Sequence, residues 1–478
     1  MKQQGWNFDN TYTQLPEMFY SRQQPAEPPR AQMAVFNREL ALSMGLDAEG
    51  LAQTPGLLAG GGVPAGAQPV ALAYAGYQFG HFAMLGDGRA VLLGEQITPD
   101  GRRLDVQLKG SGRTPYSRGG DGLAALLPML REYIVSEAMH ALGIPTTRSL
   151  AVVGTGGEVQ REKMLEGAVL TRVAASHIRV GTFNYAAAFG TPGDVRALAD
   201  YSIGRHFPWL ESADEGERYV LFLREVAKRQ AALIAKWQLT GFVHGVMNTD
   251  NMAISGETID YGPCAFMDTF DPDTVFSSID TAMRYAYKNQ PGIGAWNLAK
   301  LAESILPLIN ADEDRAVELA KEEIAAYMRH YDECWLHGMR NKLGLTGDDP
   351  QDADLFASLL TLMHKHRLDY TSTFRALSRQ EAFMPENAEL AEWARKHAAR
   401  LAQTNTSPQA ASETMLRHNP AVIPRNHRVE EALAAAEEGD YTPMHSLLEV
   451  LHTPFEDSYV YSLPPEQGSC AYRTFCGT

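Results

Sequence analysis

Cysteine is scarce in this chain, and two marks of secreted or membrane proteins are missing. The four cysteines, Cys264, Cys334, Cys470 and Cys476, are too few and too scattered for a disulfide scaffold, and no C-x-x-C pair suggests a zinc site. No apolar run reaches the roughly 18 residues that span a bilayer, and the N-terminus MKQQGWNFDNTY lacks a basic stretch followed by an apolar one. The sequence therefore predicts a soluble, cytoplasmic protein in a reducing compartment, with no membrane partner.

Basic residues are in the minority as well. The chain has 42 Lys and Arg against 58 Asp and Glu, a formal net charge of −16. Binding of a nucleic acid needs a basic face, so no nucleic acid partner is expected, and a polyphosphate ligand would need a locally basic pocket. With 478 residues, 45% of them hydrophobic, the chain is long enough for two or three units of core.

Three parts follow one another along the chain and predict an α+β protein. Residues 1–59 are rich in aromatic residues and proline, with a short helical pattern at 34–46, and are expected to form an arm packed on the body. Residues 60–180 carry strand patterns, and residues 181–478 are mainly helical. The expected fold is a small antiparallel sheet with one helix, followed by a large helical part.

The strand patterns predict a five-stranded sheet. Three antiparallel strands are expected between residues 71 and 110, with turns at Gly-Asp-Gly and Pro-Asp-Gly. A helical stripe starts at residue 123, and two further strands are expected at 144–154 and 166–176. In the helical part, a long amphipathic helix is expected at 217–241 and further helices from 295 to 452, with polar breaks near residues 345–352 and 403–410.

The stretch HGVMNTDNMAISGETIDYGPCAFMD, residues 244–268, carries the strongest chemical signal. His244 begins a pattern similar to a kinase catalytic loop, and the D-Y-G triplet at Asp260 is similar to the metal-binding triplet of kinases. Asn251 and Asp260 would supply the hard oxygen ligands that Mg²⁺ or Mn²⁺ takes beside a nucleotide. Val246 stands where a kinase has its catalytic aspartate, and Asp250 is the nearest carboxylate that could replace it. The alternative for Asp250 is a turn-forming role in the loop.

A second set of residues predicts phosphate binding. Gly86 and Gly88 would let backbone amides approach a phosphate, with Arg89 just beyond, although a plain hairpin turn explains the glycines equally well. Lys109 ends the third strand, where a kinase-like fold keeps its phosphate-binding lysine. The glycine-rich loop 110–122 follows directly and is either a phosphate cradle or a flexible surface loop.

Two arginines and two glutamates complete the predicted site. Arg172 and Arg179, seven residues apart, would converge on a polyphosphate, or would lie solvated at the sheet edge. Either Glu132 or Glu137, on the helix after the loop, could pair with Lys109. Helical periodicity places Glu137 nearer the apolar face but does not separate the two.

Taken together, HGVMNTDN, DYGP, LGDGRAVLLGE, QLKGSGRTPYSRGGDG and the C-terminal cysteine make the chain resemble the selenoprotein O family over nearly its whole length. The resemblance implies a two-lobe protein-kinase-like fold that binds ATP in a flipped orientation and transfers AMP to hydroxyl side chains of proteins. It implies Asp250 as catalytic base, Asn251 and Asp260 on the metal, and Glu132 as the partner of Lys109. The residues that it implies in nucleotide contact are Gly86, Gly88, Arg89, Lys109, Asp121, Gly122, Arg172, Arg179 and Asp260.

The resemblance leaves several points open. Family members join a C-terminal cysteine to one beyond the metal aspartate, but that region here has Ser277 and Ser278, so a regulatory disulfide with Cys476 stays open. UTP could replace ATP as donor, and the protein targets are not visible in the sequence. A true kinase and an inactive pseudokinase scaffold are the competing hypotheses. Val246 weakens the first, while Lys109, Asn251 and Asp260 weaken the second.

Overall fold

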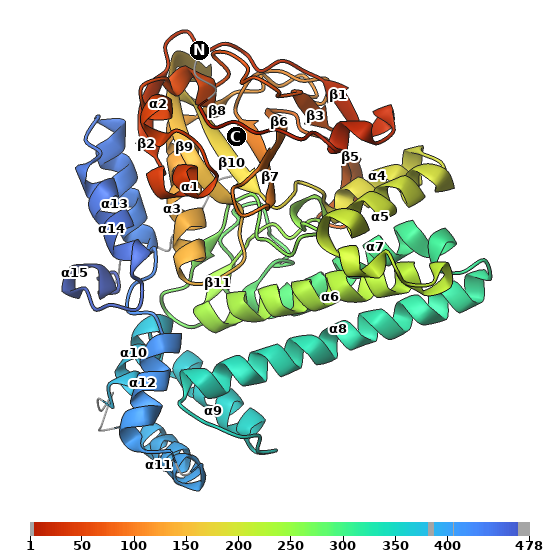
Figure 1. The fold of residues 1–478 in the computed structure, drawn as a ribbon. Coiled ribbons are helices and arrows are strands. Elements are labelled where there is room, and N and C mark those ends of the chain that lie inside the picture. The colour runs from red at the N-terminus through yellow and green to blue at the C-terminus, as the bar shows by residue number, and fades with distance from the viewer. Residues whose placement is uncertain (1–3, 381–386, 405, 467–478) are drawn as a thin grey trace.

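The computed structural model describes residues 4–380, 387–404 and 406–466 and has an α+β fold (Figure 1). An antiparallel sheet and α3 occupy one end, and the remaining long helices lie beneath and beside them. The strands are β1 (Tyr20–Arg22), β2 (Gln32–Phe36), β3 (Val70–Leu72), β4 (Ala75–Gln78), β5 (His81–Met84), β6 (Ala90–Ile97), β7 (Arg103–Lys109), β8 (Ala124–Ala125), β9 (Arg148–Gln160), β10 (Met164–Ala174), β11 (Phe242–Val243) and β12 (Ala265–Phe266).

The helices follow the apolar periodicity of the sequence, and most of them come after the sheet. They are α1 (Arg38–Ser43), α2 (Ala48–Ala52), α3 (Leu126–Ala141), α4 (Val180–Phe189), α5 (Pro192–His206), α6 (Glu215–Thr240), α7 (Gln290–Ile309), α8 (Glu313–Lys342), α9 (Asp352–Lys365), α10 (Tyr370–Ser378), α11 (Ala388–Gln403), α12 (Pro408–His418), α13 (Asn426–Glu437), α14 (Thr442–His452) and α15 (Tyr459–Ser462). The predicted long helix is α6, and the predicted breaks separate α8 from α9 and α11 from α12. No helix of the described residues is long and apolar enough to cross a membrane.

The main sheet has eight strands rather than the five predicted. Its order is β1-β3-β6-β7-β10-β9-β2, with β8 pairing β10, and each strand pair is antiparallel. Both end strands come from the first 59 residues: β1 pairs β3, and β2 pairs β9. The predicted helix at 34–46 is therefore wrong at its start. Residues 32–36 form an edge strand, and the Asn37 side chain then caps α1 by accepting a hydrogen bond from the Leu40 amide.

The first predicted strand is also corrected. Residues 70–72 join the main sheet as β3, but β4 and β5 form a separate two-stranded hairpin with Phe79 and Gly80 at its tip. Both tip residues have positive φ, 51° and 88°, as the favoured two-residue turn of a β-hairpin requires. Period-two alternation alone could not separate β3 from the hairpin. The boundaries at residues 59 and 180 stay predictions.

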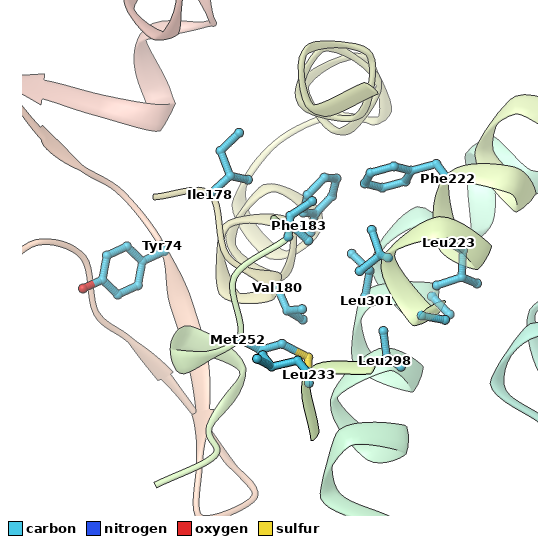
Figure 2. Close-up of a cluster of buried hydrophobic side chains, with 14 of the residues drawn as sticks. Tyr74, Ile178, Val180, Phe183, Phe222, Leu223, Leu233, Met252, Leu298 and Leu301 are labelled. Atoms are coloured by element: carbon cyan, nitrogen blue, oxygen red, sulfur yellow. The ribbon is translucent and has the colours of Figure 1, made fainter. Parts of the chain in front are cut away.

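Apolar burial holds the helical part together and fixes the loop after β11. The largest buried cluster draws side chains from α3 to α8 and from several strands and loops, and it includes fully buried side chains from α4, α6 and α7. Figure 2 shows part of this cluster, in which Met252, two positions after Asp250, packs among side chains of three helices. These side chains are Val180, Phe183, Phe222, Leu223, Leu298 and Leu301. Burial of each such side chain stabilises the fold by about 1.5 to 3 kcal/mol. The loop that carries Asp250 is therefore anchored in the core.

Candidate active site

A single cavity of about 720 Å³ opens between the sheet and the loop that carries Asp250. Its walls come from the β5–β6 turn, the glycine-rich loop after β7, the ends of β7 and β10, and residues 246–263. All eleven residues singled out in the sequence line this cavity: Gly86, Gly88, Arg89, Lys109, Asp121, Gly122, Arg172, Arg179, Asp250, Asn251 and Asp260. The structure thus brings together residues that are far apart in the sequence, from Gly86 to Asp260.

Strand register explains why the cations share one face of the sheet. Arg172 on β10 lies opposite Gln107 on β7, and Lys109 is two residues further along β7. Side chains two apart on a strand point to the same face, so Gln107, Lys109 and Arg172 project together. Arg172 donates from Nη2 to Gln107 Oε1 at 2.6 Å, which fixes its guanidinium against the sheet.

Glu132 is the partner of Lys109. The distance from Lys109 Nζ to Glu132 Oε2 is 2.6 Å, and both side chains are buried. Glu137, one turn further along α3, instead accepts hydrogen bonds from Arg148 at 2.6 Å and from the Ser149 amide at 3.0 Å. Periodicity was right that Glu137 is buried, but burial alone does not identify which cation a carboxylate meets.

Asp260 is the centre of the charged cluster. Its Oδ1 accepts from Lys109 at 3.0 Å and Arg172 at 2.6 Å, and its Oδ2 accepts from Arg179 at 2.9 Å. Burial pushes the pKa of Asp260 up, but the three cations outweigh burial and hold this pKa well below its usual range. Its backbone φ is 62°, a conformation uncommon outside glycine that is typical of functional sites. The side chain itself is 21% exposed, toward the cavity.

Asp87 was missed as a functional candidate, because G-D-G looks like an ordinary turn. Its buried carboxylate accepts from Gln107 Nε2 at 2.8 Å and from the Leu72 amide at 3.2 Å, and lies 4.0 Å from Arg179. Burial raises the pKa of Asp87 to about 6, and Arg179 opposes that shift. A chain of buried contacts therefore runs from Asp87 through Gln107 to Arg172, behind the cavity wall. Only the pairing of β3, β6, β7 and β10 creates it.

Arg179 is held from several sides. Its guanidinium lies over the Tyr74 ring at 4.5 Å, and its Nη1 also donates to the backbone carbonyl of Asp250 at 2.9 Å. Arg89, in contrast, lines the cavity with a side chain that has no hydrogen bond or ion pair among the described residues. Burial lowers the pKa of Arg89. A guanidinium of this kind is available for an anionic ligand.

The glycine-rich loop packs on the Gly86–Gly88 turn. Gly86 has a φ of 95°, and a Cβ there would lie 2.5 Å from the Tyr116 ring, so this turn needs glycine. The Thr114 hydroxyl donates to the Asp87 carbonyl at 2.6 Å. Arg161, another residue that the sequence did not indicate, pairs with Asp121 at 2.7 Å and lines the cavity.

Asp250 lies between two glycines. A Cβ on Gly76 would lie 2.1 Å from Asp250 Oδ1, and a Cβ on Gly181 would lie 3.1 Å from its Cα. The Asp250 carboxylate is buried at the cavity wall, and its Oδ1 has no hydrogen-bond partner within the described residues. Burial raises the pKa of Asp250 to about 6, opposed by Arg179. Oδ1 packs against Gly76, while the residue as a whole lines the cavity, and a carboxylate at a cavity wall is suited to accept a proton from a bound ligand.

The donor set for a metal ion is small but of the right type. The Asn251 side-chain nitrogen donates to the Val246 carbonyl at 3.0 Å, and its amide oxygen accepts no hydrogen bond from the described residues. Together with the Asp260 carboxylate, this oxygen gives the hard ligands that Mg²⁺ or Mn²⁺ accepts, with phosphate and water completing the shell. Across residues 4–380, 387–404 and 406–466, no group of three or more His, Cys, Asp or Glu side chains could hold a metal ion. The two residues thus fit a metal that arrives with a nucleotide.

His244 ties the start of the loop to the segment that leads to Asp260. Its buried ring lies 2.9 Å from the Ile259 carbonyl through Nε2 and accepts the Val246 amide at Nδ1, 3.4 Å away. Burial lowers the pKa of His244, so the neutral ring donates from Nε2. His244 is structural, and it sets the spacing between Val246 and Asp260.

A buried frame holds the segment between β10 and α4, which ends at Arg179. The Ala175 amide donates to Glu257 at 3.0 Å and its carbonyl accepts from Arg205 at 2.6 Å, while the His177 amide donates to Asp105 at 2.8 Å. Arg205 in turn pairs with Asp105 at 2.6 Å. None of these residues has a recognisable sequence motif.

Cysteines take no visible part in the cavity. Cys264 is a buried free thiol whose pKa is raised by burial, and Cys334 is a partly buried free thiol on α8. Cys470 and Cys476 lie outside the described residues, so the predicted question of a disulfide at Cys476 stays open.

Comparison with known proteins identifies the chain's relatives. A family described as "Protein adenylyltransferase SelO" matches residues 3–452. The chain belongs to the SelO family. It is 60% identical over 484 aligned residues to "Protein nucleotidyltransferase YdiU" of Geobacillus kaustophilus, with 99% of both chains covered. Proteins of the same name from Brevibacillus brevis and Clostridium botulinum are 59% and 56% identical and are covered to 98%. The resemblance to the selenoprotein O family, first seen in the motifs, is confirmed.

SelO family membership fixes the kind of enzyme. The family and the YdiU proteins are named for transfer of a nucleotide to protein, and the cavity of this SelO member has the cationic walls that such a donor needs. The chain is therefore a protein nucleotidyltransferase, and the residues of its motifs line one cavity.

Proposed function

We propose that this enzyme, a protein nucleotidyltransferase, transfers AMP from ATP to Ser, Thr or Tyr hydroxyls of proteins, on a two-lobe protein-kinase-like fold. One observation carries the proposal: the cavity has Val246 where a kinase keeps its base, and its wall also holds the buried carboxylate of Asp250, beside the predicted metal ligand Asn251. From the scattered cysteines we also propose a reducing, cytoplasmic setting.

The cationic residues would hold the phosphates of ATP. Lys109, Arg172 and Arg179 already meet at Asp260, and Arg89 faces the same cavity without a partner among the described residues. A triphosphate would provide these cations with further oxygen partners in a partly buried site, where such contacts are strong. The backbone at Gly86, Gly88 and Gly122 would allow the nucleotide to approach closely. Asp121, which is held by its ion pair with Arg161, would also contact the nucleotide.

The transfer step places Asp250 at the acceptor. The hydroxyl oxygen attacks the α-phosphorus, its proton passes to Asp250, and the bond from the α-phosphorus to the bridging oxygen breaks, so that pyrophosphate leaves. Asn251 and Asp260 would hold Mg²⁺ or Mn²⁺, which neutralises charge on the phosphate oxygens when bound. Lys109, Arg172 and Arg179 stabilise the charge that develops on the leaving pyrophosphate.

Two alternatives remain testable in the same assay. A kinase-like transfer would move the γ-phosphate, and a pseudokinase scaffold would move nothing. UTP could serve in place of ATP, with UMP transferred, because nothing in the cavity walls distinguishes the two bases by charge.

The decisive experiment follows label into protein. ATP labelled at the α-phosphate or at the γ-phosphate is incubated with the full-length enzyme, Mg²⁺ or Mn²⁺ and a mixture of protein acceptors. We expect α-label on protein and no γ-label, and intact mass spectrometry should show the addition of AMP. Incorporation of γ-label alone would make the protein a kinase, and the same pair of experiments with UTP measures the donor preference.

A further inference from the structure

A row of aromatic rings runs along the outside of the β4–β5 hairpin, next to the cavity. Phe189, at the end of α4, lies 6.2 Å from Phe82 on β5, and Phe82 lies 5.3 Å from Tyr77 on β4. Tyr77 contacts Trp296 on α7 at 5.5 Å, and the guanidinium of Arg284 lies 4.7 Å from the Trp296 ring. We call these five residues the aromatic row.

Two members of the aromatic row are open to solvent, whereas most large apolar side chains are buried; Tyr77, Trp296 and Arg284 are partly buried. Phe82 is 42% exposed and Phe189 is 57% exposed, and Met84, beside them on β5, is 39% exposed. Contiguous exposed apolar groups of this kind mark interaction sites more often than scattered ones do. At its other end, Arg284 has no carboxylate within ion-pair distance in the part of the chain that the structure describes.

The hairpin that carries the row is joined directly to the loop of Asp250. The Tyr77 amide donates to the Thr249 hydroxyl at 2.9 Å, and the Phe79 amide donates to Asn248 Oδ1 at 3.1 Å. Between them, Gln78 lines the cavity and hydrogen-bonds the Asp250 carboxylate. Since neighbouring strand residues point to opposite faces, Gln78 faces Asp250, while Tyr77, its neighbour on β4, faces away from it.

We propose that the aromatic row binds the segment of polypeptide that carries the acceptor hydroxyl. An apolar side chain of the acceptor would pack on Phe82 and Phe189, and an acidic side chain would pair with Arg284. This inference rests on the proposed function and names its acceptor: a hydroxyl residue flanked by one aromatic or large aliphatic residue and one acidic residue.

Two observations favour a polypeptide acceptor over a second copy of this chain. The hairpin that carries the row contacts Asp250 with its opposite face, through Gly76 and Gln78, so an acceptor segment bound along the row lies across a single hairpin from the carboxylate. The unpaired Arg284 gives one defined charge contact, which suits recognition of a short extended segment. A larger apolar face would be expected for a stable dimer.

The test uses the full-length enzyme, ATP with Mg²⁺ or Mn²⁺, and synthetic peptides with one tyrosine. One peptide has Phe and Asp near the tyrosine, a second has Ser and Asp, and a third has Phe and Lys. We expect the first peptide to have the lowest KM. Phe82→Ser and Phe189→Ser should raise that KM about tenfold, with kcat, nucleotide affinity and Tm near wild type. Leu42→Ser, at a 63% exposed site on α1, is the matched control and should change nothing.

Charge reversal tests the Arg284 contact separately. Arg284→Glu should raise the KM of the Asp peptide and lower that of the Lys peptide, so that the preference between the two reverses. Equal KM values for the three peptides, or Phe189→Ser with unchanged KM, would overturn the inference while leaving AMP transfer intact. A wild-type enzyme that dimerises in sedimentation, with Phe189→Ser monomeric, would assign the row to a second copy instead. Failure of the wild type to label any peptide or protein would count against the proposed function itself.

Discussion

Asp250 packs closely between Gly76 and Gly181, and a mutation can separate its proposed role in proton transfer from its structural role. Asp250→Asn keeps the side-chain shape but cannot accept a proton, so we expect nucleotide transfer to fall by roughly a hundredfold or more. Nucleotide affinity and Tm should stay near wild type. Asp271→Asn, at a half-exposed carboxylate, is the control. Near-normal transfer by Asp250→Asn, or loss of the fold, would return Asp250 to a turn-forming role.

Asp260 allows a different test, because it gathers three cations. Asp260→Ala should remove the metal dependence of nucleotide binding and lower transfer by roughly a hundredfold or more, which corresponds to about 3 kcal/mol of lost transition-state stabilisation. Lys109→Ala should also lower transfer and weaken nucleotide binding, but it should keep the dependence on Mg²⁺ or Mn²⁺. Titration of nucleotide binding with and without chelator distinguishes the two variants. Metal-dependent binding by Asp260→Ala would make the metal assignment wrong.

The motif residues could be predicted from the sequence because their chemistry is local. Asp250 and Asn251 are neighbours, Asp260 follows nine residues after Asn251, and Lys109 ends a strand. Asp87, Gln107 and Arg161 could not be found, because their roles depend on strand pairing between distant segments. A glutamine in a strand and an aspartate in a glycine turn look ordinary until register places them beside an arginine.

At the scale of elements, α3 offers two buried glutamates with different partners. Glu132→Gln removes the charge beside Lys109 and Arg172, so nucleotide affinity and transfer should fall by about tenfold or more, since unpaired buried charge is costly. Glu137→Gln breaks the contact with Arg148 and should lower Tm while nucleotide affinity stays unchanged. Measuring both quantities on both variants checks the assignment. A larger loss of nucleotide affinity in Glu137→Gln would contradict it.

The segment between β10 and α4 should respond to pH through Glu257. Burial raises the pKa of Glu257 to about 7, above the value of about 4.3 of an unfolded glutamate. Between these values the folded protein holds the proton that the unfolded chain releases, so the free energy of unfolding falls as pH rises. Between pH 5 and pH 8 the Tm of the wild type should therefore fall further than the Tm of Glu257→Gln. The difference between the two decreases should be about 2 to 5 °C.

The Glu257 comparison has a built-in control. Asp87 and Asp250, whose pKa values are also raised to about 6, remain in both proteins and cancel in the difference. His177 and His206, whose pKa values burial lowers from about 6.5 to about 4 and about 3, are also present in both proteins, so their contribution cancels as well. Parallel Tm curves for the variant and wild type would show that Glu257 does not titrate as described.

Whether an element could be predicted from the sequence depends on whether local or distant residues stabilise it. Long helices such as α6 and α8 follow from a local apolar period, and their breaks follow from polar stretches. The two end strands β1 and β2 could not be predicted, because each has only a few residues and gains its hydrogen bonds from a distant partner. The β4–β5 hairpin was merged with β3 for the same reason.

For the whole molecule, the first residues of the chain close both ends of the sheet. Trp6, Tyr12, Phe19, Tyr20 and Val35 are buried there, each contributing about 1.5 to 3 kcal/mol, which together approaches the whole stability of a typical protein. A chain that begins at residue 38 is therefore expected to lose cooperative unfolding and to aggregate.

A graded variant keeps this prediction testable. Phe19→Ala in the full-length protein should lower stability by about 3 kcal/mol or more, whereas Leu42→Ala, at an exposed site, should stay within about 0.5 kcal/mol of wild type. Thermal and denaturant unfolding give both values. A shortened chain that folds and binds nucleotide would show instead that residues 1–37 are dispensable for the fold.

The two glycines that lie against Asp250 place this residue between the β4–β5 hairpin and the start of α4. Gly76 belongs to β4 and Gly181 to α4, and both lie against Asp250, so a movement of either element would also move Asp250. An acceptor bound to the hairpin as proposed would therefore also steady Asp250, the proposed base. If this steadying tightens nucleotide binding by some factor, bound nucleotide must tighten acceptor binding by the same factor, because thermodynamic coupling between two sites is reciprocal.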